Sequence, residues 1–66
     1  MELRINGETK SFEAPLSVAA LLEALGLPGE GIAVERNREI VKRESYSETW
    51  LEDGDELEIV TLVGGG

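Results

Sequence analysis

The sequence predicts an α+β fold, in which a mixed β-sheet is covered on one face by one main helix. Segments with an apolar residue at every second position lie at both ends of the chain, and an apolar stripe with helical spacing lies between them. The 66 residues suffice for one domain. At this length about 60% of the unfolded chain's surface becomes buried, so the core is small.

The first segment predicts a β-hairpin. Met1, Leu3 and Ile5 alternate with charged residues and so share one face of a strand. Asn6-Gly7 supplies the backbone freedom of a tight turn. The chain should return as a second strand over 8–13, where only Phe12 is large and apolar. The polar residues of this segment predict a weakly buried sheet edge.

After Pro15 the apolar residues follow a helical period, which predicts a helix over residues 18–25. Ser17 is a good N-cap, and Leu16 can pack on Leu21 as a hydrophobic staple. Gly26 stands where a left-handed residue ends a helix.

The middle of the chain predicts two short strands, over 32–36 and around 39–41, joined by a turn at Asn37-Arg38. The polar stretch 42–48 suits a turn of 3₁₀-helix, with Tyr46 packing at the edge of the core. Trp50-Leu51 should then approach the sheet, and the turn at 53–55 leads into the last strand, over 56–62.

The last strand should bury one face and expose the other. Leu57 and Ile59 alternate with Glu56 and Glu58, so the apolar pair points inward and the period of two sends Val60 and Leu62 outward. We expect the first and last strands to pair in parallel at the centre of the sheet. The predicted core consists of Leu3, Ile5, Phe12, Val18, Leu21, Leu22, Leu25, Val34, Leu57 and Ile59.

Composition argues against several functions. The chain has no Cys and no His, which disfavours a metal centre and a thiol nucleophile. A formal charge of −8 argues against nucleic acid and favours basic protein partners. No apolar stretch reaches the ~20 residues of a membrane span, and the N-terminus lacks a signal-peptide pattern. We therefore expect a cytoplasmic protein that is monomeric when free.

The sequence ends in Val63-Gly64-Gly65-Gly66. We expect residues 1–62 to form the domain and 63–66 a flexible tail. Four extended residues reach at most ~14 Å, and glycine has no Cβ to obstruct a narrow passage, so this tail could thread a carboxylate into an active site. Three final glycines could also be a frayed end or a remnant of expression cloning, and the tail alone favours that interpretation.

The order of elements and the final glycines resemble the β-grasp fold of ubiquitin-like proteins, and in detail the ThiS family of sulfur carriers. The resemblance covers essentially the whole chain. Gly64 departs from it, because many relatives have a bulkier residue there. The resemblance rests on Asn6-Gly7, Ser17-Val18, Val34-Glu35-Arg36-Asn37, Ile40-Val41, Asp53-Gly54-Asp55, Glu58-Ile59-Val60 and Val63-Gly64-Gly65-Gly66.

The resemblance implies a sulfur carrier of thiamin (thiazole) biosynthesis. In that scheme an adenylating enzyme, related to ubiquitin-activating enzymes, uses ATP and Mg²⁺ to convert the Gly66 carboxylate into an acyl-adenylate. Sulfur from a cysteine-desulfurase pathway then yields a thiocarboxylate, which thiazole synthase consumes. The chain would be a co-substrate rather than an enzyme, with no catalytic residue, cofactor or metal of its own. Val60, Leu62, Val63, Gly64 and Gly65 would contact the partners.

Other functions remain open at this point. The small subunit of molybdopterin synthase shares fold, tail and chemistry, but its family tends to carry an apolar, proline-bearing segment before Gly-Gly. A protein-conjugating modifier ranks below it, being usually longer. A binding module with an unreactive tail differs only in the chemistry at Gly66. An enzyme acting through Glu52, Asp53 and Asp55 is disfavoured, because such a cluster is usually a solvated turn.

Overall fold

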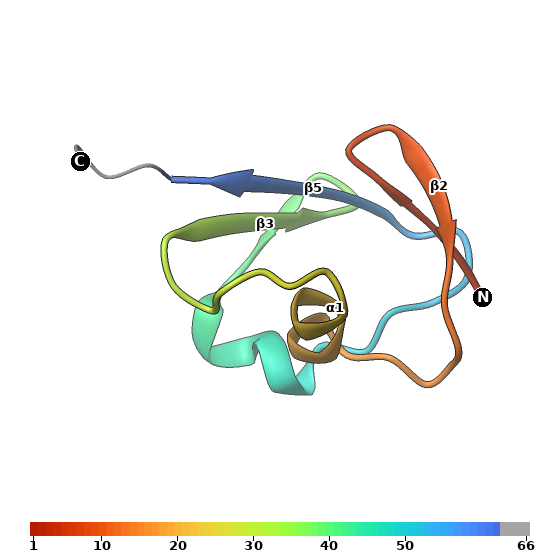
Figure 1. Cartoon of the computed structure of the whole chain (residues 1–66), viewed down its shortest axis with the longest axis horizontal. Coiled ribbons are helices and arrows are strands. Elements are labelled where there is room, and N and C mark those ends of the chain that lie inside the picture. The colour runs from red at the N-terminus through yellow and green to blue at the C-terminus, as the bar shows by residue number, and fades with distance from the viewer. Residues whose placement is uncertain (63–66) are drawn as a thin grey trace.

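A computed structural model describes residues 1–62 and confirms the predicted fold class: a mixed five-stranded sheet carries its helices on one face (Figure 1). The strand order is β2-β1-β5-β3-β4. The elements are β1 (Glu2–Ile5), β2 (Glu8–Ser11), α1 (Val18–Ala24), β3 (Ile32–Arg36), β4 (Glu39–Val41), the 3₁₀-helix η1 (Arg43–Glu48) and β5 (Glu56–Thr61).

The first and last strands pair in parallel at the centre of the sheet, as the sequence predicted. Arg4 lies beside Glu56, and Ile5 lies beside Leu57. On its other side β5 pairs with β3 in the antiparallel sense, over five residue pairs from Arg36↔Leu57 to Ile32↔Thr61. The central strand β5 is therefore held by a short neighbour and a longer one.

The N-terminal hairpin turns at Asn6 and Gly7, which both have positive φ, at 50° and 84°. Two such residues in succession suit the tight hairpin turn whose twist matches the flanking strands. β2 is exposed along its whole length at the sheet edge. It ends at Ser11 rather than at residue 13, although the Phe12 N–H still donates to the Met1 carbonyl (2.8 Å).

Side chain and backbone contacts set both ends of α1. The Ser17 hydroxyl accepts from the Ala20 N–H (3.1 Å), which confirms the N-cap. At the other end Gly26 has φ +72° and its N–H donates to the Glu23 carbonyl, while the Leu27 N–H donates to the Leu22 carbonyl. This pair of bonds is the Schellman arrangement. The helix is one residue shorter than predicted, because Leu25 is its C-cap.

The segment between β4 and β5 packs under the sheet beside α1. η1 spans six residues and buries Tyr46, in agreement with the prediction. After it, the Leu51 N–H donates to the Leu16 carbonyl and the Val18 N–H donates to the Thr49 carbonyl. Leu51 enters the core, whereas Trp50 remains exposed and reaches only an isolated bridge with Ser17.

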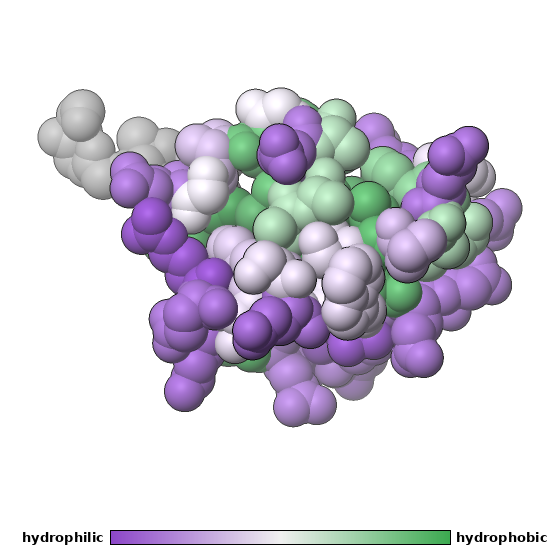
Figure 2. Space-filling model, turned by 90° about the horizontal axis from the view of Figure 1, so that it is seen from below, coloured by the Kyte–Doolittle hydropathy of each residue, from purple (hydrophilic) through white to green (hydrophobic). Residues whose placement is uncertain are grey.

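The core lies between the sheet and α1, and eight of the ten predicted residues are buried in it. Phe12 and Leu25 are only partly buried, because each lies just beyond the end of an element. Partly buried apolar residues close the core from the side of α1, where Figure 2 shows apolar surface surrounded by hydrophilic side chains. The buried apolar residues are Leu3, Ile5, Val18, Leu21, Leu22, Ile32, Val34, Tyr46, Leu51, Leu57 and Ile59.

Within residues 1–62 no helix has the length and apolar character that crossing a membrane requires.

Replacing Leu22 with Ala should lower the free energy of unfolding by about 2–5 kcal/mol, since the side chain is 3% exposed and its loss leaves a cavity. Denaturant unfolding measures this. The neighbouring Glu23→Ala, on the exposed side of the same helix, should change stability by less than about 0.5 kcal/mol. Equal effects of the two substitutions would place the apolar stripe wrongly.

Candidate functional site

The exposed face of β5, at the end of the strand, is the candidate site. Leu57 and Ile59 are buried, whereas Val60 and Leu62 are 53% and 57% exposed. The predicted inward and outward phases are therefore confirmed for these four residues. Thr61 shares the inward phase but is exposed, because it lies at the end of the sheet.

The neighbours of Val60 give this face an apolar end and an acidic middle. Val60 lies beside Ala33 of β3, which is partly buried. One step back along the same face, Glu58 lies beside Glu35. Like charges directly opposite each other on a sheet are destabilising. These two carboxylates, together with Glu56 and Arg38, line a shallow depression of about 200 Å³.

Backbone bonds to β3 fix the exposed residues in place. The Leu62 N–H donates to the Gly31 carbonyl at 2.6 Å, one residue beyond the end of β5. Gly31 itself has φ +70° and lies directly before β3. Val60 and Leu62 thus project from a backbone that is paired with β3 up to the last described residue.

On the other side of β5, beyond the end of β1, the side chain of Asn6 bonds to the backbone of β5. The Ile59 N–H donates to the Asn6 Oδ1 atom (2.8 Å), and the Asn6 Nδ2 atom donates to the Ile59 carbonyl (3.0 Å). The amide of Asn6 therefore makes the two bonds that the backbone of a neighbouring strand would make. Asn6 was predicted only as a turn residue, and this second role has no signal in the sequence.

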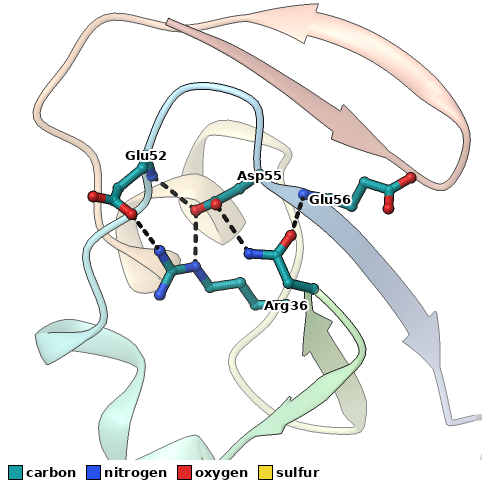
Figure 3. A network of polar contacts seen from close by, with 5 residues as sticks. Arg36, Glu52, Asp55 and Glu56 are labelled. Atoms are coloured by element: carbon teal, nitrogen blue, oxygen red, sulfur yellow. Dashed lines mark hydrogen bonds and ion pairs between the residues drawn. The ribbon is translucent and has the colours of Figure 1, made fainter.

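A polar network holds the start of β5 to the turn between β3 and β4 (Figure 3). Asp55 Oδ2 accepts from Arg36 Nε and from the Glu52 N–H, both at 2.8 Å, and its Oδ1 accepts from Asn37 Nδ2 at 3.0 Å. Asn37 Oδ1 in turn accepts from the Glu56 N–H (3.0 Å). Arg36 also approaches the carboxylate of Glu52, at 3.5 Å.

Asp55 corrects one sequence prediction. Glu52 and Asp53 are exposed, as expected for a solvated turn, but Asp55 is only 6% exposed. Burial by itself raises the pKa of the Asp55 carboxyl. The hydrogen bonds from the Glu52 N–H, Asn37 and Arg36, and the charge of Arg36, outweigh burial and hold that pKa below its usual 3.8. The Asp55 carboxylate therefore acts as the common acceptor that joins the Glu52 backbone, Arg36 and Asn37.

The surface away from the end of β5 holds a further depression. In residues 1–62 no group of three Asp and Glu side chains is arranged to hold a metal ion. A larger depression, of about 400 Å³, lies between β4 and η1 and is lined by Arg36, Lys42, Ser45 and Thr49 among others. It includes neither Val60 nor Leu62, so it lies apart from the candidate site.

Only part of the predicted site falls within the described residues. Val60 and Leu62 lie on one exposed face, as expected. Val63, Gly64, Gly65 and Gly66 lie outside the described residues. The bonds from the side chains of Asn6, Arg36 and Asn37 to residues 55–59 were not predicted, because they join positions far apart in the chain.

Comparisons with known proteins agree with this fold. A family model, described as the ThiS family, matches residues 3–66. The crystal structure of a thiamine biosynthesis protein (ThiS) from Geobacter metallireducens superposes with a TM-score of 0.86 at 36% identity, covering 100% of both chains. The sulfur carrier protein ThiS of Bacillus subtilis is 38% identical over 65 residues, which are 97% of this chain and 98% of that protein.

One group of relatives is much longer. A thiazole synthase of Paramagnetospirillum magneticum is 52% identical over all 66 residues, and a thiazole synthase of Magnetococcus marinus is 39% identical over the same length. The chain spans 20% of each of these two proteins.

Acid should weaken the domain partly through Asp55. Since the pKa of this carboxyl is lower in the folded than in the unfolded state, its contribution to stability is complete above pH 3.8 and is lost as the pH falls below that value, toward the folded pKa. Asp55→Asn should cost about 1–3 kcal/mol at pH 7 and reduce the loss of stability on acidification.

Denaturant unfolding at a series of pH values tests this effect. Asp53→Asn is the matched control, because Asp53 lies in the same turn, is exposed and accepts a single bond from the Glu2 N–H. If both variants show the same pH profile, the Asp55 network does not stabilise the fold as described.

Proposed function

The chain belongs to the ThiS family of sulfur carriers in thiamine biosynthesis, and from this membership we propose that it carries sulfur as a thiocarboxylate at Gly66. The observation that carries the proposal is the exposed end of β5, with Val60 and Leu62 directed outward just before the sequence Val63-Gly64-Gly65-Gly66. We propose that this face docks on the partners while Val63, Gly64 and Gly65 lead the carboxylate into their active sites.

The chemistry requires activation of the carboxylate. A free carboxylate is a poor electrophile, whereas a mixed anhydride with AMP has a good leaving group. In the proposal an adenylating enzyme holds ATP and Mg²⁺, one carboxylate oxygen of Gly66 attacks the α-phosphorus, and pyrophosphate leaves. A sulfur nucleophile supplied by a cysteine-desulfurase pathway then displaces AMP. The chain acts as a co-substrate, and its partners supply catalysis.

The long relatives support thiazole synthase as the protein that consumes the sulfur. In two proteins named thiazole synthase, a segment similar to this whole chain is part of the same polypeptide as the remaining 80%. Joining a carrier to its acceptor keeps the effective concentration of the two high. Both the family match and the named carriers favour thiamine over molybdopterin biosynthesis. The proposal places the carrier in the cytoplasm, together with its adenylating enzyme.

Incubation of the chain with its adenylating enzyme, ATP, Mg²⁺ and a sulfur source should replace one terminal oxygen with sulfur, which intact-mass analysis detects. Gly65→Val should block the reaction, because a β-branched side chain stands where backbone must pass closely. The variant should retain the stability of the wild type, since the substitution lies beyond Ile59, the last residue that is buried within the described range 1–62. An unmodified mass, under conditions in which an established carrier is converted, would refute the proposed function for that enzyme.

Val60→Asp should weaken binding to the adenylating enzyme or to thiazole synthase by tenfold or more, because a charge replaces an exposed apolar contact at the docking face. Titration calorimetry measures the affinity, and circular dichroism checks the fold. Ile40→Asp is the control, since Ile40 is also apolar and exposed but lies on the edge strand β4, which β3 separates from β5. Unfolding of Val60→Asp would show that the two faces of β5 have been reversed.

A further inference from the structure

Successive backbone groups of β5 point alternately toward its two neighbouring strands. The carbonyls of Asp55 and Leu57 accept bonds from the β1 side, where Arg4 N and Asn6 N each donate at 2.9 Å. The Glu56 carbonyl and the Leu62 N–H bond on the β3 side, to Asn37 N (2.7 Å) and Gly31 O (2.6 Å). Odd-numbered residues therefore direct their backbone groups toward β1, and even-numbered residues toward β3.

Within residues 1–62, the pairing of β5 on its β1 side stops before the strand ends. The β1 pairing reaches only Ile5↔Leu57, and the amide of Asn6 serves the next odd residue, Ile59. The following odd residue is Thr61, which is exposed and, among residues 1–62, has a strand partner only in β3. Figure 1 shows this end of β5 extending past the β1–β2 hairpin, with β3 alone beside it.

We propose that the β1-side edge of β5 at Thr61 binds an extended segment of the adenylating enzyme, which adds there as a short strand. The inference rests on the proposed function and adds to it how the enzyme binds the carrier at the end of β5. The Thr61 N–H and carbonyl supply the backbone bonds. An added strand lies next to Val60 and Leu62, whose exposed side chains lie on one face of the sheet and can pack against its residues.

Charge favours a partner over a second copy of the chain as the occupant. Two copies each carry a formal charge of −8, so bringing the same edges together places like charges side by side. Glu58 shares the face of Val60 and precedes it by two residues. A segment with an apolar residue next to Lys or Arg therefore complements this edge.

Hydrogen exchange of single backbone amides tests the proposal. In the free carrier the Thr61 amide should exchange fast, whereas the flanking Val60 and Leu62 amides, which face β3, should be protected. In complex with the adenylating enzyme without ATP, Thr61 should become protected by tenfold or more. The exchanged complex is quenched and dissociated, and the carrier is read residue by residue by NMR.

Thr61→Pro removes the N–H that points away from β3 and so leaves the intramolecular ladder intact. Its KM for adenylation should rise roughly tenfold, the loss expected for one backbone bond. Thr61→Val, which keeps both the N–H and the branched side chain, should behave as the wild type. Protection of the Val60 and Leu62 amides in each free variant verifies that the end of β5 is intact.

The outcomes separate the two proposals. If Gly66 gains sulfur while Thr61 stays unprotected in the complex and Thr61→Pro reacts normally, strand addition is refuted and the carrier function stands. If Thr61 becomes protected in the free carrier as its concentration rises, a second copy is the occupant and the proposed partner segment is refuted. If the wild type neither binds nor gains sulfur, the proposed function itself fails.

Discussion

The position of β5 between β1 and β3 is the constraint on which the rest of the structure depends. Its parallel pairing with β1 joins segments near the two ends of the sequence, so forming the pair closes a long loop and costs the corresponding chain entropy. The cost is offset where Leu3 and Leu57, from the two paired strands, meet the apolar stripe of α1. Because the strands are parallel, β5 ends on the side of the molecule opposite the N-terminus (Figure 1).

The short β1 pairing explains why polar side chains gather along β5. Only two residue pairs join β1 to β5, and an unpaired backbone group in a partly buried place costs free energy. The Asp55 network secures the start of the strand to the β3–β4 turn, and the Asn6 amide bonds Ile59 where β1 has turned away. In residues 1–62 no buried side-chain polar atom is left without a partner. Side-chain hydrogen bonds thus add to the small core at the places where β1 does not pair with β5.

Local patterns predicted the fold well because each helix or strand is indicated by a few neighbouring residues. The period of two in β5 fixed which of Leu57 and Val60 is buried, and the Asn6-Gly7 turn fixed the first hairpin. The edges of elements were less predictable: Phe12 and Leu25 fall just outside regular structure and are only partly buried. Long-range polar contacts were not predictable. The local sequence around Asp55 predicts a turn, but it does not indicate that Arg36 forms an ion pair with this carboxylate.

The distribution of stabilising contacts along β5 explains how so small a domain can present one end of a strand. Within residues 1–62 the last buried residue is Ile59, and the Asp55 and Asn6 bonds also act at or before that position. From Val60 to Leu62 the side chains are exposed, and the backbone bonds described there go to β3 and to Gly31 directly before it. A protein that grips this end therefore removes no core contact from the carrier. Binding therefore does not have to unfold any part of the core. The stability of the domain and the binding of a partner at the end of β5 depend on different residues.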